Sequence, residues 1–271
     1  MLPKPHHLSE VYADQFKDPS VVRAYSCRPP YPEEVFGLLA QLIVDAPSIV
    51  LDLGCGTGDC AIPLAARGYQ IHAVDPSEVM IRVGQSRPGG DAPNLKWFCC
   101  SAETFSYDER YALVVAAESF HWMAWDQVIP KISHALLPHG QLALLNRHES
   151  HGPWSPELQK LIRQYSTNRD FQPYDLIQEL ERRHLFRVRG RQRTAPIRFV
   201  QSIDDYVEAV HSRNGFSRER MPVERAQGFD DACHTLLSPY FPDGYVEFDL
   251  EVDVVWGVPV TSALSGYHPS V

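Results

Sequence analysis

The sequence predicts a doubly wound α/β protein with a mostly parallel sheet and an antiparallel C-terminal strand. Three observations support this prediction. Short apolar runs alternate with helical stretches between Ser48 and His148, a glycine-rich turn follows the first of these runs, and apolar residues alternate strictly with acidic ones over residues 246–254. Strands that alternate with helices favour a parallel sheet with right-handed crossovers and a ligand at the carboxyl ends of the strands.

Five short runs are predicted to form the parallel strands. Most are rich in residues that suit a sheet buried on both faces. In chain order they are Ile49–Leu51, Ile71–Val74, Leu95–Phe98, Leu113–Ala116 and Leu142–Leu145. Helices are expected between them, where capping and breaking residues bound the helical stretches. These helices are Asp59–Arg67, Ser77–Arg87 and Trp125–Leu137.

The C-terminal part has a different pattern. Residues 246–254 have a period of two, which indicates a strand with one wet face, and we expect it to be antiparallel and near an edge of the sheet. A further strand is expected around Arg193–Phe199. Four helices are expected upstream of the last strand, and some should cap the carboxyl edge of the sheet and enclose a substrate. They are Pro156–Tyr165, Tyr174–Arg183, Ile203–Ser212 and Val223–Leu237.

Composition disfavours several kinds of partner. The 271 residues include 34 acidic and 25 basic side chains, a net charge of −9, so the basic surface that nucleic acid requires is not expected. No apolar run approaches the roughly 20 residues that span a bilayer, so no membrane partner is expected. Residues 1–17 lack the hydrophobic core of a signal peptide, which predicts a cytoplasmic protein.

The cysteines and histidines show no ligand or disulfide pattern. The six cysteines include no C-x-x-C pair, which predicts free thiols. The 12 histidines lack the spacing of metal ligands, so no metal is expected.

The segment after the first strand is the most informative. Asp52 is followed by glycine at every second position, at Gly54, Gly56 and Gly58, before a helical stretch. Glycines let the chain turn tightly and bring backbone N–H groups close to a ligand. Asp75 ends the next strand about 20 residues after the first glycine, where a carboxylate can bind ribose hydroxyls. These features predict a ligand that contains adenosine.

The glycine spacing favours one class of such ligands. A dinucleotide fingerprint requires glycine where Asp59 stands, and a carboxylate there would repel a diphosphate. The pattern D-x-G-x-G-x-G fits instead, and it predicts a nucleoside that carries an amino-acid tail.

The segment VLDLGCGTG with VDPS at 74–77 resembles motifs I and II of the class I S-adenosylmethionine-dependent methyltransferases. AYSCRPPYP at 24–32, SAE at 101–103 and ESFHW at 118–122 are similar to the methyltransferase type 11 or trans-aconitate methyltransferase-like small-molecule branch. The similarity covers roughly residues 10–146. It implies a Rossmann-like sheet of seven strands in a single domain, with a lid (1–32), a cofactor-binding core (33–148) and a cap (149–271).

The resemblance also implies where the cofactor S-adenosylmethionine would bind. Gly54, Cys55 and Gly56 would line its methionine portion, while Glu118 and Ser119 would flank the amino-acid tail.

The nucleoside would contact a second group of residues. Asp75 would bind the ribose, Pro76 and Met80 would face the adenine ring, and Ala102 and Glu103 would meet its edge. Met80 can equally be core filler, and Glu103 can be a solvated strand end.

Tyr25 and Arg28 would belong to the lid, with Arg28 gripping the tail carboxylate through two parallel hydrogen bonds. Arg28 can equally pair with Glu33 or Glu34. His121 faces the acceptor as a tentative catalytic base, although a packing role is also open. A group of basic residues in the C-terminal part can attract an anionic acceptor or be solvated charges: Arg187, Arg189, Arg191, Arg193 and Arg198.

The resulting hypothesis is a methyltransferase for a small-molecule acceptor, with transfer to a carboxylate or hydroxyl favoured and N-methylation possible. The alternatives are a catalytically silent, methyltransferase-like binding or regulatory subunit and, less favoured, a nicotinamide-dependent oxidoreductase. A monomer or homodimer is expected. The acceptor and the methylated atom are left open.

Overall fold

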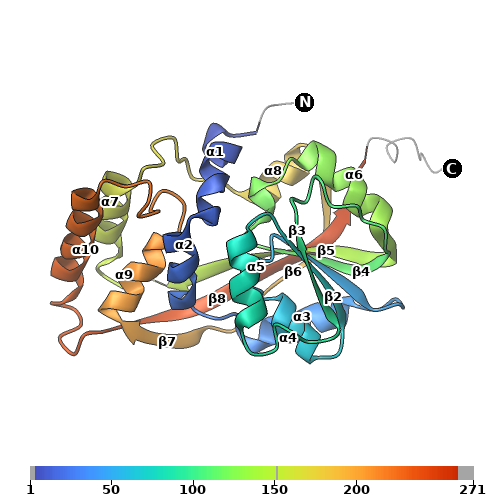
Figure 1. Ribbon diagram of the computed structural model, residues 1–271, viewed down its shortest axis with the longest axis horizontal. Coiled ribbons are helices and arrows are strands. Elements are labelled where there is room, and N and C mark those ends of the chain that lie inside the picture. Colours follow the sequence, from blue (N-terminus) through green and yellow to red (C-terminus); the bar gives the residue numbers. More distant parts are fainter. Residues whose placement is uncertain (1–3, 151, 262–271) are drawn as a thin grey trace.

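A computed structural model describes residues 4–150 and 152–261 of the chain (Figure 1). Its described residues form an eight-stranded sheet in the order β3-β2-β1-β4-β5-β8-β6, with β7 also paired to β8. The strands are β1 (Ile49–Leu53), β2 (Gln70–Asp75), β3 (Leu95–Cys99), β4 (Tyr111–Ala117), β5 (Leu136–Ser150), β6 (Phe186–Arg193), β7 (Ile197–Ser202) and β8 (Tyr245–Pro259). The predicted α/β class is confirmed.

The five predicted parallel strands are β1 to β5, and all of them pair in parallel. Alternate residues of β4 face two separate hydrophobic cores, with Val114 in one and Val115 in the other. Helix α6 (Trp125–Ala135) packs on the first core, while α3 (Glu33–Leu42) and α4 (Ala61–Ala66) pack on the second. Burial of both faces explains the apolar sequences of these strands.

Helix α5 (Glu78–Ser86) begins where the sequence predicts, because the Ser77 side chain accepts a hydrogen bond from the backbone N–H of Met80. Helix α4 begins at Ala61 rather than at Asp59, since residues 54–60 are taken up by the glycine turn. This start corrects the prediction that the helix spans Asp59–Arg67.

The prediction for the last strand is confirmed. Strand β8 is antiparallel and lies near an edge of the sheet, one place inside it, between β5 and the short edge strands β6 and β7. The strand expected around 193–199 is in fact two strands, and Thr194 bridges them through two hydrogen bonds with the backbone of Val252. This division gives eight strands where the resemblance implied seven.

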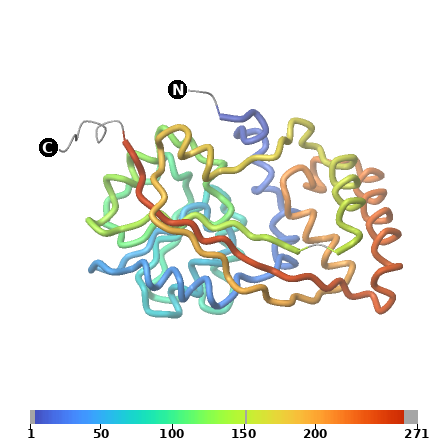
Figure 2. Tube along the Cα trace, turned by 180° about the vertical axis from the view of Figure 1, so that it is seen from behind, coloured from blue at the N-terminus to red at the C-terminus, as the bar shows by residue number. Residues whose placement is uncertain are grey.

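Strand β8 also connects the sheet to a second group of helices, as Figure 2 shows. Its first residues, Val246 and Phe248, pack in a core with helices of the C-terminal part, while Val252 and Val254 belong to the main sheet core. The helices of this third core, which lies in the C-terminal part, are α7 (Ser155–Tyr165), α9 (Ile203–His211) and α10 (Val223–Leu237). Helix α8 (Leu176–Arg182) packs on the sheet instead, through Leu180.

The N-terminal segment, which we define as residues 4–32, lies between the two groups of helices (Figure 1). It contains η1 (His6–Leu8), α1 (Glu10–Ala13), η2 (Asp14–Lys17), α2 (Pro19–Ala24) and η3 (Tyr25–Cys27). Val21 and Val22 of α2 pack against Met80 of α5. The segment therefore contacts the core through apolar side chains.

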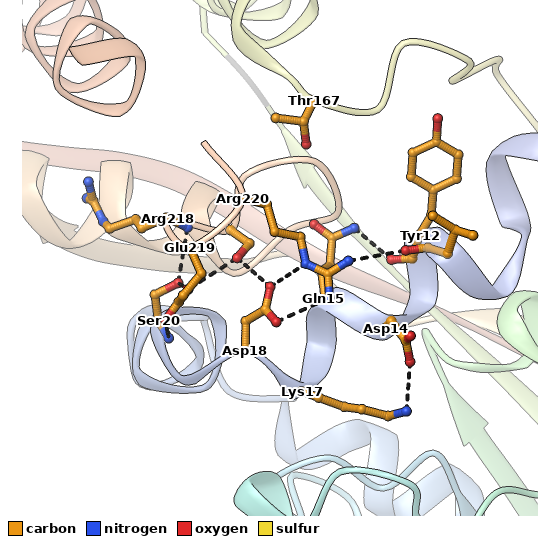
Figure 3. A network of polar contacts seen from close by, with 12 residues as sticks. Tyr12, Asp14, Gln15, Lys17, Asp18, Ser20, Thr167, Arg218, Glu219 and Arg220 are labelled. Carbon is orange, nitrogen blue, oxygen red and sulfur yellow. Dashed lines mark hydrogen bonds and ion pairs between the residues drawn. The ribbon is translucent and has the colours of Figure 1, made fainter. Parts of the chain in front are cut away.

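Polar contacts hold the other side of the N-terminal segment (Figure 3). Asp18 accepts hydrogen bonds from Ser217 Oγ at 2.6 Å and from Arg220 Nε at 2.6 Å. The backbone N–H of Ser20 donates to Glu219 Oε1 at 2.9 Å. These contacts tie the segment to the loop between α9 and α10.

Candidate functional site

A cavity of about 1350 Å³ lies at the carboxyl ends of the parallel strands, beneath the N-terminal segment. Its walls come from the β1–α4 turn, the ends of β2, β4 and β5, and residues 4–31. All thirteen predicted site residues line it: Tyr25, Arg28, Gly54, Cys55, Gly56, Asp75, Pro76, Met80, Ala102, Glu103, Glu118, Ser119 and His121. Their individual roles stay predictions.

The turn after β1 requires glycine, because its backbone has positive φ values and its surroundings leave little room for a Cβ atom. Gly54, Gly56 and Gly58 have φ values of +70°, +53° and +84°. A Cβ atom on Gly54 would lie 2.4 Å from the Cβ of Ser119. Ser119 is itself fixed, because its Oγ donates to the carbonyl of Leu53 at 2.6 Å. Glycine at alternate positions therefore shapes the floor of the cavity.

Asp75 ends β2 and is held by the same turn. One carboxylate oxygen accepts from the Gly56 N–H at 2.9 Å, and the other accepts from the Ser77 N–H at 2.8 Å. Burial raises the pKa of Asp75 to about 6, although these two hydrogen bonds oppose the rise. Each oxygen can accept a second hydrogen bond, so the carboxylate is oriented for a diol.

Asp52 is a buried acid with unsatisfied oxygens. Its side chain lines the cavity and is 1% exposed, and neither carboxylate oxygen has a hydrogen-bond partner among the described residues. Burial raises its pKa to about 8, and the charges of Asp75 and Asp59 add to the rise. A cationic ligand group would satisfy this carboxylate.

The end of the cavity near β3 is closed by residues with structural contacts of their own. Met80 is 2% exposed and lies between the cavity and the N-terminal segment. Glu103 accepts a hydrogen bond from the Ala124 N–H at 2.7 Å. Glu103 is therefore anchored to the start of α6 and is no solvated strand end, which leaves one carboxylate oxygen for another partner.

Arginines gather at the opposite end of the cavity. Arg28 stacks 4.0 Å from the Tyr25 ring centroid and donates to Ser212 Oγ at 2.6 Å and to its carbonyl at 2.7 Å. This arrangement corrects the alternative that Arg28 pairs with Glu33 or Glu34. Its nearest acidic neighbour is Glu118, at 4.0 Å.

Arg147 was missed in the sequence. It follows the apolar run of β5, stacks 4.0 Å from the Tyr31 ring centroid, and lies 3.6 Å from Glu118 and 3.7 Å from Asp59. Its position at the carboxyl end of a buried parallel strand is a signal that could have revealed it. Arg213 also lines the cavity, but only the fold brings it there.

His121 lines the cavity, and the structure gives its ring no hydrogen bond among the described residues. Burial, together with the charges of Lys4 and His7, lowers its pKa to about 3. The side chain is therefore neutral at physiological pH and is a weak base.

The five predicted basic residues of the C-terminal part do not reach the cavity. Arg187, Arg189, Arg191, Arg193 and Arg198 are exposed on β6 and β7. Two of them pair with acids of β8, Arg193 with Asp253 at 2.7 Å and Arg198 with Glu247. Their exposed positions outside the cavity favour the alternative that they are solvated charges, because none of the five lines the site that would bind the acceptor.

The family model described as a methyltransferase domain matches residues 50–140, the stretch from β1 into β5. Residues 50–140 of this chain are thus similar to a methyltransferase domain. The predicted resemblance to the class I methyltransferases is confirmed, since this stretch includes the glycine turn, Asp75 and the parallel strands. Arg28, Arg147 and Arg213 all lie outside it.

Known proteins are similar to the methyltransferase domain and its surroundings. An uncharacterised methyltransferase of Mycobacterium tuberculosis is 33% identical over 53% of this chain and 57% of its own length. A trans-aconitate 2-methyltransferase of Methylobacterium radiotolerans is 28% identical over 40% of this chain and 41% of its own. The chain thus spans about half the length of these relatives.

A solved structure is similar in fold over most of the chain. A provisionally assigned type II methyltransferase from Anaeromyxobacter dehalogenans has a TM-score of 0.56 and 19% identity, covering 85% of this chain and 97% of its own. No helix of the described residues is both long and apolar enough to cross a membrane.

Proposed function

We propose that this protein is an S-adenosylmethionine-dependent methyltransferase that modifies a small-molecule acceptor. The observation that carries the proposal is the joining of the glycine turn, Asp52 and Asp75 in one cavity. Asp59 occupies the position that a dinucleotide fingerprint reserves for glycine, and it is paired with Arg87 at 2.5 Å. The carboxylate of Asp59 would repel the diphosphate of a dinucleotide, whereas a ligand with an amino-acid tail has no phosphate at this position.

The cavity suits the cofactor chemically. A Cβ at Gly54 would collide with Ser119, so only glycine lets the turn run this close to the end of β4. The Asp52 carboxyl, which has no hydrogen-bond partner among the described residues, is suited to an ammonium group. Asp75 would hold the ribose, and Arg28 beside Tyr25 would hold the tail carboxylate. When bound, S-adenosylmethionine supplies an activated methyl group on a sulfonium.

The protein's contribution would be alignment and exclusion of water. The cavity exceeds the roughly 300–1,000 Å³ of a pocket for one drug-sized ligand, so it has room for a cofactor and an acceptor together. We propose that residues 4–32 act as a lid over both ligands. Fixed orientation inside such a site is worth several kcal/mol of the barrier.

The neutral His121 bears on the acceptor. A base whose conjugate acid has a pKa of about 3 removes a proton from an alcohol poorly, so we favour an acceptor that arrives already ionised. A carboxylate meets this condition at neutral pH. The name of the trans-aconitate 2-methyltransferase relative is consistent with an acid as acceptor.

Calorimetric titration tests the cofactor assignment. S-adenosylhomocysteine should bind with micromolar affinity, NAD should not, and Asp75→Asn should weaken binding about ten-fold or more. Asp91→Asn, at an exposed position outside the cavity, is the matched control. Binding of NAD alone would favour the oxidoreductase.

Incubation of the protein with methyl-labelled cofactor and a small-molecule extract tests turnover. A labelled product supports an enzyme. Tight cofactor binding without any labelled product would instead favour the silent binding or regulatory subunit.

A further inference from the structure

A side pocket of about 260 Å³ lies next to the main cavity, between β5, α9 and the N-terminal segment. Four residues line both spaces, Arg28, Glu118, Arg147 and Arg213, so these side chains form the boundary that the two spaces share. Pro29, Glu149 and Ala209 complete its lining. Three guanidinium groups therefore face two carboxylates in a small space.

Arg147 is buried but incompletely paired. Its side chain is 7% exposed, and its Nε has no hydrogen-bond partner among the described residues. The carboxylates of Glu118 and Asp59 lie 3.6 and 3.7 Å away, which is beyond ordinary hydrogen-bond distance. Tyr31 covers one face of the guanidinium, which leaves its in-plane N–H groups to bind a ligand.

The other two arginines differ in how firmly they are engaged. Arg28 already donates two hydrogen bonds to Ser212, and it stacks on Tyr25 beside Gly56. Arg213 donates to both oxygens of Glu149, at 3.1 and 2.9 Å, and yet its side chain is 41% exposed. Arg213 therefore has accessible surface in the pocket, while Arg28 is directed toward the cofactor side.

The topology separates the side pocket from the nucleoside. Asp75 stands at the end of β2, on one side of β1, whereas Arg147 lies in β5 on the other side, just beyond the last residue that pairs with β4. The side pocket therefore lies away from the nucleoside end of the cavity, on the side of β1 that carries β4 and β5. An acceptor attacks the methyl group from the side opposite the sulfur, so it must occupy space that the nucleoside does not fill.

We propose that Arg147 and Arg213 form a subsite for a carboxylate of the acceptor that is not itself methylated. This inference rests on the proposed function and extends it. An oxygen held by two guanidinium groups has its lone pairs engaged and is a poor nucleophile, so the attacking oxygen belongs to another group of the same molecule. The acceptor class is thus a small acid with an anionic group in addition to the reacting oxygen.

Calorimetry on the protein loaded with S-adenosylhomocysteine tests the subsite, with glutarate as the probe. Glutarate should bind at least about ten-fold more tightly than the uncharged glutaramide, because its carboxylate forms charge-assisted hydrogen bonds. Inorganic phosphate should bind more weakly than glutarate. Equal binding of acid and amide would overturn the subsite, and tighter binding of phosphate would overturn its assignment to a carboxylate.

Variants assign the residues. Arg147→Gln and Arg213→Gln should each weaken glutarate binding about ten-fold, while the affinity for S-adenosylhomocysteine changes less than about three-fold. Arg191→Gln, exposed on β6, should change neither. Loss of S-adenosylhomocysteine binding in Arg147→Gln, with glutarate binding intact, would place Arg147 on the cofactor tail and contradict the proposal.

Thermal unfolding identifies a variant that has lost its fold. If Arg147→Gln does not fold, the more exposed Arg213→Gln decides the question on its own. Failure of the wild-type protein to bind S-adenosylhomocysteine would refute the proposed function, whereas normal cofactor binding with no preference for glutarate would refute only the subsite.

Discussion

The guanidinium of Arg147 lies 4.0 Å from the ring centroid of Tyr31, so a residue of β5 rests on a residue of the N-terminal segment. The same segment supplies Tyr25 beneath Arg28 at the same distance. The N-terminal segment thus provides aromatic rings for two of the three arginines at this end of the cavity, Arg28 and Arg147. The orientation of these two arginines therefore depends on the N-terminal segment being closed over the cavity.

The stack itself can be tested at Tyr31. Tyr31→Leu removes the ring beneath Arg147 and should raise KM for the acceptor about 5- to 30-fold, since a desolvated cation–π contact contributes about 1–2 kcal/mol. Tyr31→Phe keeps the ring and should behave nearly like the wild type. Steady-state kinetics with the acceptor varied measures both. Equal losses in the two variants would mean that the hydroxyl group matters and the stack does not.

Cofactor affinity should rise with pH. Burial raises the pKa of Asp75 to about 6, so its carboxyl is protonated at pH 5 and ionised at pH 8. Only the ionised form accepts hydrogen bonds from both ribose hydroxyls with full strength. Calorimetry should therefore show tighter binding of S-adenosylhomocysteine at pH 8 than at pH 5, with a smaller pH effect in Asp75→Asn. A pH-independent affinity in the wild type would rule out this role for Asp75.

Stability of the free protein should change with pH in the opposite direction. Burial, with the charges of Asp75 and Asp59, raises the pKa of Asp52 to about 8, whereas an unfolded Asp titrates near about 3.9. The folded protein therefore retains a proton between these values that the unfolded chain releases. The contribution of Asp52 to the free energy of unfolding falls as pH rises through this range.

Asp52→Asn removes this titration. Urea unfolding at pH 5 and at pH 8 should show a smaller loss of stability on raising the pH than in the wild type. An unchanged loss would show that Asp52 is ionised in the folded protein.

His121 should contribute little as a base. A general base typically contributes about 100-fold or more to the rate. Because the pKa of His121 is lowered to about 3, His121→Gln should reduce kcat less than about ten-fold and leave the pH–rate profile without a change near pH 6.5. If the wild type shows an acidic limb near pH 6.5 in its pH–rate profile and His121→Gln loses it, His121 is the general base.

The polar contacts of the N-terminal segment should control its opening. Asp18→Asn weakens the contacts with Ser217 and Arg220, and should increase hydrogen exchange in residues 10–27 and weaken cofactor binding. For hydrogen exchange Asp14→Asn is the matched control, because among the described residues Asp14 pairs with Lys17 of its own segment at an exposed position. Equal exchange in both variants would show that these contacts do not hold the segment closed.

Local chemistry explains which features were predictable. The functional turn was predictable because glycine marks positions with positive φ, here Gly54, Gly56 and Gly58, and because Asp75 directly ends a recognisable strand. Helix α10 has the predicted bounds because its apolar pattern depends on neighbouring residues alone. The interior position of β8 was not predictable, since it depends on pairing with strands more than 40 residues earlier in the chain. An alternating strand looks the same in sequence at an edge and one place inside it.

The arginine end of the cavity was only half predictable for a similar reason. Arg28 lies in a motif, but its partner Ser212 is 184 residues away, and Arg213 enters the cavity only because that loop folds against the N-terminal segment. The exposed arginines of β6 and β7 showed the reverse. Their charge density indicated an anion site, although the acids of β8 already balance part of it.

A crystal structure with S-adenosylhomocysteine bound tests the central claim most directly. The account predicts that the ribose hydroxyls contact Asp75, that the amino-acid tail lies over the glycine turn toward Arg28 and Glu118, and that the side pocket at Arg147 and Arg213 remains available. A nucleoside bound elsewhere, or a tail that fills the side pocket, would contradict it.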